Sequence, residues 1–281
     1  MWTRREFGKV SLSTLAALAS RQLFAATKRP IGVQLYTVRH QIADLPEMLN
    51  ALRQIGYTQV ETYTDLYQSY TAAALRQLIS DNGLAVPSGH FDYETFDEKM
   101  DYAGALGLRY MTCPMLPKSM QNLDGFKKAA DRFNKWGTAL QQRGMKFAFH
   151  NHNYEFREFG DTDGFDTLLT RTDPKLVFFE MDCYWMTQAG RDPVKMLEQY
   201  PKRIRMLHLK DRKPGFPPSQ ELNDAAGHFT EVGTGTLNWK AILALAEKNN
   251  IDYMFVEQDE TERPVLESLR ISYNNLQKLL T

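Results

Sequence analysis

One repeating unit of the fold can be read in Arg143-Gly144-Met145-Lys146-Phe147-Ala148-Phe149-His150. Residues 126–143 carry apolar side chains at helical spacing, which predicts a helix. Gly144 follows this segment and can take the left-handed conformation that ends a helix. A short apolar run follows and stops at a histidine. A helix, a glycine, a buried strand and a metal-competent side chain in this order predict an alternating β/α protein with its active site beyond the strand ends.

The same unit repeats along the chain. The expected strands are residues 31–36, 59–62, 85–88, 109–113, 145–150, 177–182, 204–208 and 253–257. The expected helices are residues 45–55, 75–81, 102–106, 126–143, 164–172, 193–200, 238–249 and 265–280. Strict alternation of eight strands with eight helices predicts a single-domain (β/α)8 TIM barrel of the α/β class.

Residues 1–26 are predicted to be separate from this barrel. Arg4 and Arg5 lie in a short basic segment, and the weakly apolar stretch 10–19 that follows is too short to span a bilayer. The pattern is typical of a twin-arginine signal peptide. Cleavage is expected after Ala26, with Ala19 as the alternative, which leaves residues 27–281 as the barrel domain and predicts a periplasmic or otherwise exported protein.

The charge of the chain limits its partners. The sequence contains 34 basic and 34 acidic residues, and residues 1–26 hold four of the basic and one of the acidic ones. The barrel domain therefore has a net charge of about −3. Because no basic stripe remains, nucleic acid is not an expected partner, and no further apolar segment predicts membrane contact. A small-molecule substrate is expected, and a homo-oligomer remains open.

Four strands in the second half of the chain end in metal-competent side chains, namely His150, Asp182, His208 and Glu257. The carboxyl ends of parallel strands lie on one face of a barrel, so we expect the four side chains to converge. Imidazole nitrogen and carboxylate oxygen together form a mixed donor set for a divalent ion with room for water or substrate. The alternative for each residue is an ordinary hydrogen-bonded polar group at the barrel mouth.

Other side chains at the strand ends are candidates for substrate binding. They are Gln34, Tyr36, Glu61, His90 and Trp185. His90 has the alternative role of a hydrogen-bonded histidine inside the barrel. For Tyr36 and Trp185 the alternative to a platform under a sugar ring is core packing.

Several motifs recur at these strand ends: Gly32-Val33-Gln34-Leu35-Tyr36, His150-Asn151-His152, Asp182-x-Tyr184-Trp185, His208-Leu209-Lys210-Asp211 and Val256-Glu257-Gln258-Asp259. As a set they resemble the xylose isomerase-like TIM barrels, which include sugar phosphate isomerases and epimerases, inosose dehydratases, keto-sugar lyases and a class of DNA repair endonucleases. The resemblance covers essentially the whole mature chain. It implies a divalent metal held by His150, Asp182, His208 and Glu257. Manganese is the first expectation, with magnesium, cobalt and zinc as alternatives.

The chain departs from the family's epimerases at His150, where they place a glutamate. Their two glutamates act as an acid/base pair, and only Glu257 remains here. A second base would come from His152, Glu155 or Lys210. The expected catalytic residues are therefore Glu257, His152 and Lys210. Because the His-x-His motif is closer to the inosose dehydratases, isomerisation and elimination both remain open, and both begin with removal of a proton next to a carbonyl.

The sequence also limits the substrate. No glycine-rich phosphate cradle is visible, and the basic side chains at the strand ends are Lys210 and Arg212. A non-phosphorylated keto-sugar, cyclitol or glycoside is expected. A nuclease would need a basic groove and further histidines, and a sugar-binding protein would not need four metal ligands. The sequence thus predicts a metal-dependent sugar isomerase or epimerase, with a dehydratase or lyase as the alternative.

Overall fold

The computed structural model describes residues 29–281 apart from residues 68 and 226. The predicted signal peptide, residues 1–26, lies outside the described residues. The barrel strands are β1 (Gly32–Gln34), β2 (Gln59–Tyr63), β3 (Ala85–His90), β4 (Tyr110–Cys113), β5 (Lys146–His150), β8 (Val177–Asp182), β9 (Ile204–Leu209) and β12 (Tyr253–Val256). They close in the order β1-β12-β9-β8-β5-β4-β3-β2, and every neighbouring pair is parallel.

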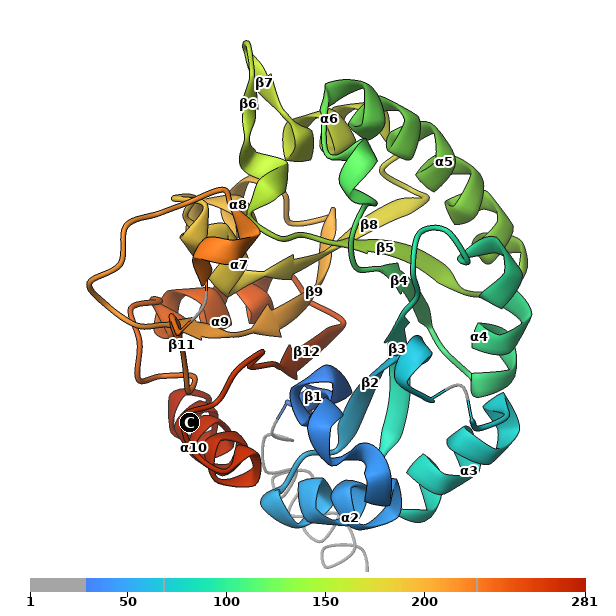
Figure 1. Ribbon diagram of the computed structural model, residues 1–281, viewed down its shortest axis with the longest axis vertical. Helices are drawn as coiled ribbons and strands as arrows, with labels where there is room; N and C mark the ends of the chain where they lie inside the picture. Colours follow the sequence, from blue (N-terminus) through green and yellow to red (C-terminus); the bar gives the residue numbers. More distant parts are fainter. Residues whose placement is uncertain (1–28, 68, 226) are drawn as a thin grey trace, which may run out of the picture.

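Helices surround this barrel on the outside (Figure 1). They are α2 (Leu45–Ile55), α3 (Ala72–Asp81), α4 (Met100–Leu106), α5 (Leu123–Gln142), α6 (Gly164–Arg171), α7 (Cys183–Gln188), α8 (Pro193–Gln199), α9 (Trp239–Lys248) and α10 (Val265–Leu279). The predicted single-domain TIM barrel is confirmed. Each of the eight predicted helices is present among the described residues, with ends that differ by a few residues.

Strict alternation is interrupted by two short strand pairs outside the barrel and by an extra helix between β8 and β9. There the chain forms an additional short helix, α7, before α8. The cause is local: Asp182 ends β8 and caps α7, since its Oδ1 accepts a hydrogen bond from the backbone N–H of Trp185 at 2.8 Å. A side chain predicted as a metal ligand is therefore also a helix cap.

The helix–glycine–strand unit forms as predicted. Gly107 and Gly144 follow α4 and α5 and have φ values of 87° and 74°, a region that side chains with a Cβ rarely adopt. At Gly107 the backbone N–H donates back to the last turn of the helix. Each glycine thus ends its helix and sends the chain directly into the next strand.

The interior of the barrel is layered. Near the amino ends of the strands it is filled by an apolar cluster of Tyr110, Ala148, Met206 and Phe255. Gly32 leaves space for this layer, because a Cβ there would lie 2.4 Å from the Phe255 ring. Toward the carboxyl ends the interior becomes polar, and there the buried side chains are histidines and carboxylates. The main hydrophobic core lies between the strands and the helices.

Further short elements lie mostly in the loops that follow the strands. The 3-10 helices are η1 (Leu35–Asp44), η2 (Thr64–Tyr67), η3 (Asp97–Lys99), η4 (Lys118–Met120), η5 (Tyr154–Phe156) and η6 (Leu222–Ala225). The antiparallel strand pairs are β6 (Glu158–Phe159) with β7 (Thr162–Asp163), and β10 (Asp211–Arg212) with β11 (Phe229–Thr230). The β6–β7 hairpin projects at the top of Figure 1. None of the described helices is long and apolar enough to span a membrane.

Candidate active site

The four predicted metal ligands converge. Candidate ligand atoms of His150, Asp182, His208 and Glu257 all lie within 4.8 Å of one another, and all four residues are buried. His150 and Asp182 end β5 and β8, His208 lies one residue before the end of β9, and Glu257 directly follows β12. We call this group the upper centre.

The donor atoms of the upper centre are suited to a divalent ion. Nδ1 of His208 lies 3.0 Å from Oε2 of Glu257 and 3.9 Å from Oδ2 of Asp182. Nε2 of His150 lies 3.9 Å from the same Asp182 oxygen. Oδ1 of Asp182 caps α7, and its Oδ2 is buried, 3.2 Å from Nζ of Lys210. Two imidazole nitrogens and two carboxylate oxygens fit the mixed coordination of a divalent metal.

The opposite ring nitrogens support this arrangement. Nε2 of His208 lies 2.6 Å from Oε2 of Glu61, and Nδ1 of His150 lies 3.3 Å from Oε2 of Glu180. A ring nitrogen that faces a carboxylate carries the proton in neutral imidazole, so the other nitrogen offers its lone pair. Nδ1 of His208, 3.0 Å from Glu257, and Nε2 of His150, 3.9 Å from Asp182, are the ring nitrogens directed toward the other ligands of the upper centre.

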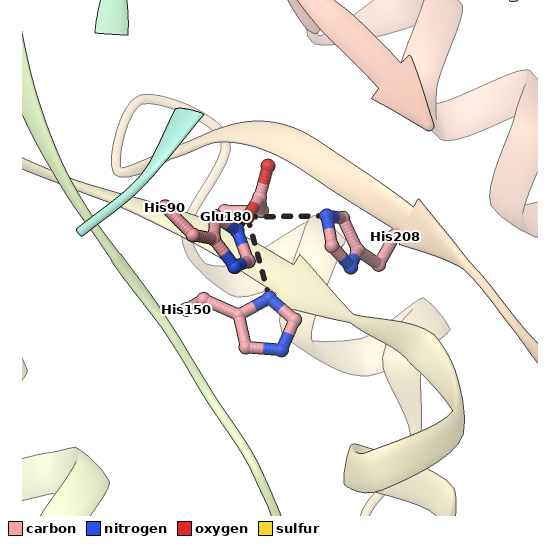
Figure 2. Close-up of side chains that lie close together, drawn as sticks. All are labelled: His90, His150, Glu180 and His208. Carbon is pink, nitrogen blue, oxygen red and sulfur yellow. Dashed lines mark hydrogen bonds and ion pairs between the residues drawn. The ribbon is translucent and has the colours of Figure 1, made fainter. Parts of the chain in front are cut away.

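Below the upper centre lies a second group, formed by Glu61, His90 and Glu180. Figure 2 shows the rings of His90, His150 and His208 around the Glu180 carboxylate. Nε2 of His90 lies 2.7 Å from Oε2 of Glu180 and 3.3 Å from Oε2 of Glu61. We call Glu61, His90 and Glu180 the lower centre. Glu180 is not among the site residues expected from the sequence, although it lies two residues before Asp182 on β8, so that both carboxylates point to the same side of the strand.

The pKa values of His90 and Glu61 in the lower centre differ from their usual values. Burial lowers the pKa of His90, but the charge of Glu61 and the hydrogen bond to Glu180 outweigh it and raise the pKa to about 9. Burial raises the pKa of Glu61, and the neighbouring charges of His90 and His208 reverse this and lower it. In the chain without metal, positive charge on the imidazoles therefore compensates this carboxylate.

Two residues expected to bind substrate lie elsewhere. Gln34 and Glu61 are fully buried and are not among the residues that line the cavity. The Gln34 amide donates to Oε2 of Glu61 at 2.8 Å, and its oxygen accepts from the backbone N–H of Tyr36. Glu61 contacts Nε2 of His208 at 2.6 Å, and Gln34 is hydrogen-bonded to Glu61, so the pair can orient the His208 ring.

A cavity of about 350 Å³ opens above the upper centre, which is the size of a small-molecule site. Three residues expected to bind substrate, Tyr36, His90 and Trp185, line it. Its other polar and charged lining residues are Tyr63, Asp92, His150, His152, Lys210, Glu257 and Asp259. Its other apolar lining residues are Pro114, Met115 and Leu222. The wall thus combines aromatic and apolar surface with several carboxylates.

Lys210 is the buried cation of this cavity. Its Nζ lies 2.6 Å from Oε2 of Glu257, 2.8 Å from Oδ1 of Asp259 and 3.2 Å from Oδ2 of Asp182. Burial opposes its charge, but the three carboxylates raise the Lys210 pKa well above its usual value. Burial likewise raises the pKa of Glu257, and Lys210 and His208 reverse this and lower it well below the usual range. Lys210 is therefore held as a charged ammonium group, not as a free base.

His152 and Glu155 have the opposite character. Burial lowers the pKa of His152 to about 3, so the ring is neutral at pH 7, and its Nδ1 has no hydrogen-bond partner. Burial raises the pKa of Glu155 to about 8, although its Oε2 accepts a hydrogen bond from the backbone N–H of His152. Of these two, only His152 lines the cavity. It is the neutral, unpaired base candidate of the site.

The last residue of the His-Leu-Lys-Asp motif has a structural role. The buried Asp211 carboxylate accepts hydrogen bonds from the backbone N–H groups of Gly233 and Gly235 and from the Trp239 indole, at 2.9, 3.0 and 2.7 Å. Asp211 therefore fastens the loop before α9. The guanidinium of Arg212 binds the Gln188 side chain and two backbone carbonyls of the following loop, so its donors are engaged within the chain.

The model of the xylose isomerase-like TIM barrel family matches residues 49–275. The chain belongs to this family. Its match spans most of the barrel and includes all four side chains of the upper centre.

Individual relatives are more distant. The chain is 28% identical over 147 residues to an inosose dehydratase of Clostridium beijerinckii, a match that covers 50% of this chain and 49% of that protein. The chain thus spans about half the length of this curated relative. A solved structure described as a sugar phosphate isomerase/epimerase from Parabacteroides distasonis is 26% identical, with a TM-score of 0.74 and coverage of 90% and 95% of the two chains.

A third structure, of the IOLI protein with a bound zinc atom, has a TM-score of 0.69 at 14% identity and covers 89% of this chain and 98% of its own. At that identity the likeness shows the fold alone.

Proposed function

We propose that this protein is a divalent-metal-dependent enzyme that removes a proton next to a carbonyl on a non-phosphorylated keto-sugar, cyclitol or glycoside. Isomerisation or epimerisation is the first candidate reaction. The observation that carries the proposal is the upper centre: two imidazole nitrogens and two carboxylates converge at the base of a cavity of about 350 Å³. The relatives described as inosose dehydratase and as sugar phosphate isomerase/epimerase support chemistry of this kind.

The residues of the upper centre have distinct roles in this proposal. His150, Asp182, His208 and Glu257 hold the ion, with manganese as the first expectation and zinc, cobalt or magnesium as alternatives. A bound divalent ion supplies polarisation of the substrate carbonyl and of the hydroxyl beside it. Glu61 orients the ring of His208 through its Nε2, and Glu180 orients the ring of His150 through its Nδ1.

Residues that line the cavity carry out the proton transfer. His152 is neutral and its Nδ1 is unpartnered, so it can accept the acidified α-proton and return it to the neighbouring carbon. Lys210 stays protonated and stabilises negative charge on the substrate oxygen. Glu257 is engaged by Lys210 at 2.6 Å and by His208 at 3.0 Å, whereas Nδ1 of His152 has no hydrogen-bond partner, so His152 is the freer acceptor.

Elimination is the second candidate reaction, and Lys210 is the observation that favours it. A protonated ammonium that lines the cavity can deliver its proton to a departing β-hydroxyl group. The same initial proton removal by His152 then ends in loss of water. The sequence likeness to inosose dehydratases agrees with this alternative.

The acidic cavity supports a substrate without phosphate. Asp92, Glu257 and Asp259 line the wall, and the cation among the lining residues, Lys210, already pairs with carboxylates. A phosphate dianion would meet repulsion without a free guanidinium to bind it. Tyr36 and Trp185 offer aromatic surface to the C–H face of a sugar ring.

Proton exchange tests this proposal directly. Purified protein loaded with Mn²⁺ is incubated in D₂O with a panel of keto-sugars, cyclitols and keto-glycosides, and NMR follows the loss of the α-proton signal. We expect exchange with at least one member of the panel, abolished by chelator and in Asp182→Ala. Exchange that survives removal of the metal would exclude the mechanism.

We also propose that the protein is exported by the twin-arginine route, on the basis of Arg4 and Arg5 in the amino-terminal segment. Replacement of both arginines by lysine should leave precursor in the cytoplasm, because lysine does not reproduce the guanidinium pair. Cell fractionation with immunoblotting measures this. Normal recovery of the variant from the periplasm would contradict the assignment.

A further inference from the structure

We propose that the barrel binds a second divalent cation at the lower centre, between Nε2 of His90 and the carboxylates of Glu61 and Glu180. Nε2 of His90 lies between the two carboxylates, 2.7 Å from Oε2 of Glu180 and 3.3 Å from Oε2 of Glu61. One nitrogen and two carboxylates form a three-residue donor set that suits Mn²⁺ or Zn²⁺. This cation lies beyond the proposed function, which concerns only the upper centre.

Unused donor atoms support the second cation. Oε1 of Glu61 and Oε1 of Glu180 are both buried and lack a hydrogen-bond partner, and both side chains are fully buried. An oxygen anion left without a partner in the interior is costly unless a cation or a proton is bound to it. The lower centre therefore keeps coordination capacity that its hydrogen bonds do not fill.

Charge balance separates the two centres. The upper centre and Asp259 carry three carboxylates, whose charge Lys210 and one divalent ion together neutralise. The ion pairs of Glu61 and Glu180 among the described residues are all to histidines. If His150 and His208 are neutral, a protonated His90 offsets one of the two carboxylate charges, whereas a divalent ion that displaces that proton would offset both.

The histidine rings connect the centres without being shared as ligands. Nε2 of His208 lies 2.6 Å from Oε2 of Glu61 and keeps its proton as a hydrogen-bond donor, and Nδ1 of His208 faces the upper centre. On binding of the lower cation, the proton on Nε2 of His90 passes to solvent and that lone pair turns to the cation. His90, which also lines the cavity, thus offers the entry path from above.

Ion counting distinguishes the lower centre from the upper one. The full chain is stripped with chelator, dialysed to equilibrium against Zn²⁺ or Mn²⁺, and analysed for bound metal per chain. We expect two ions per chain in the natural sequence and one in His90→Gln, which removes a ligand of the lower centre alone. Asp182→Asn should also bind one ion, because it removes a ligand of the upper centre alone.

A spectroscopic measurement adds a second readout. Two Mn²⁺ ions in the adjacent centres should broaden each other's electron paramagnetic resonance spectrum through dipolar interaction, and each single substitution should return the spectrum of an isolated ion. Circular dichroism melting checks that the variants fold. If His90→Gln does not fold, Glu180→Gln replaces it, since it also removes a lower ligand and keeps the side-chain shape.

The outcomes for the two proposals are different. One ion per chain at saturation, lost in Asp182→Asn and kept in His90→Gln, would overturn the second cation and leave the proposed function intact. The lower centre would then be only a hydrogen-bonded support. No bound ion in the natural sequence would overturn both proposals. Two ions that both persist in His90→Gln would also remove the lower centre as the second site.

Discussion

The two ends of the barrel each carry a buried or partly buried charge cluster, and the clusters differ in completeness. At the amino ends of the strands, Asp252 accepts hydrogen bonds from the Tyr110 hydroxyl at 2.5 Å, from Arg205 and from Lys146 at 3.3 Å. The donors include two permanent cations, and none of the Asp252 oxygens is without a partner. At the carboxyl ends, carboxylates outnumber permanent cations, and one oxygen each of Glu61 and Glu180 has no hydrogen-bond partner.

The comparison separates a structural cluster from a functional one. A carboxylate surrounded by arginine, lysine and tyrosine is satisfied by the chain alone and adds to stability. A set of carboxylates and imidazoles whose lone pairs remain free is complete only when a cation binds. Mutations at the amino ends of the strands should therefore change the stability of the protein. Mutations at the carboxyl ends should change metal binding and activity.

The largest expected effect is at the upper end. Asp182→Asn removes a ligand oxygen while the side-chain amide can still cap α7, so the fold is kept. Loss of several kcal/mol of charge stabilisation should lower the α-proton exchange rate on the order of 10³-fold. Exchange monitored by NMR, with metal analysis, measures the effect. Exchange at the natural rate with one fewer ion would show that the ion at this position does not take part.

The second effect concerns proton transfer. His152→Gln should lower exchange about 10²-fold or more, the usual contribution of a general base, and leave metal content unchanged. His228→Gln is the matched control, since His228 stacks on Phe216 in a loop and is not among the residues that line the cavity. If both variants are equally active, His152 is not the base, and Glu257→Gln then tests Glu257 in that role.

The third effect is confined to the Asp252 cluster at the amino ends of the strands. Asp252→Ala leaves Arg205 and Lys146 without their shared acceptor and should lower the free energy of unfolding by about 2 kcal/mol. The exchange rate per folded molecule should remain that of the natural sequence. Urea unfolding and the NMR assay measure the two quantities. A loss of activity without loss of stability would end the distinction between the clusters.

The fourth effect is a change in pH dependence at Glu155. Its folded pKa of about 8 lies above the unfolded value of about 4.3. Stability linked to this group is therefore complete below about pH 4 and is lost as the pH rises through about 8. Glu155→Gln should reduce the decline between pH 5 and 8 by up to about 1.4 kcal/mol per pH unit. Urea unfolding in chelator at several pH values measures it, and parallel curves would refute the shift.

Much of the upper end could be predicted because strand periodicity is local. A side chain at the end of a buried parallel strand must lie on the active-site face, which brought His150, Asp182, His208 and Glu257 together from sequence alone. The same reasoning placed Tyr36, His90 and Trp185 at the cavity wall. It could not tell how deep in the barrel a side chain lies. Gln34 and Glu61 were therefore predicted to bind substrate, although they are fully buried and do not line the cavity.

By itself, the sequence determined the barrel, its helix-ending glycines and the set of residues at its mouth, since these follow from hydrophobic period, glycine conformation and the parallel direction of the strands. The packing of distant strands was needed to show which carboxylate faces each histidine nitrogen, that Lys210 is paired with three acidic groups, and that His90 lies between Glu180 and Glu61. These contacts join strands far apart in the chain, so their heights and distances depend on strand register, which no local pattern specifies.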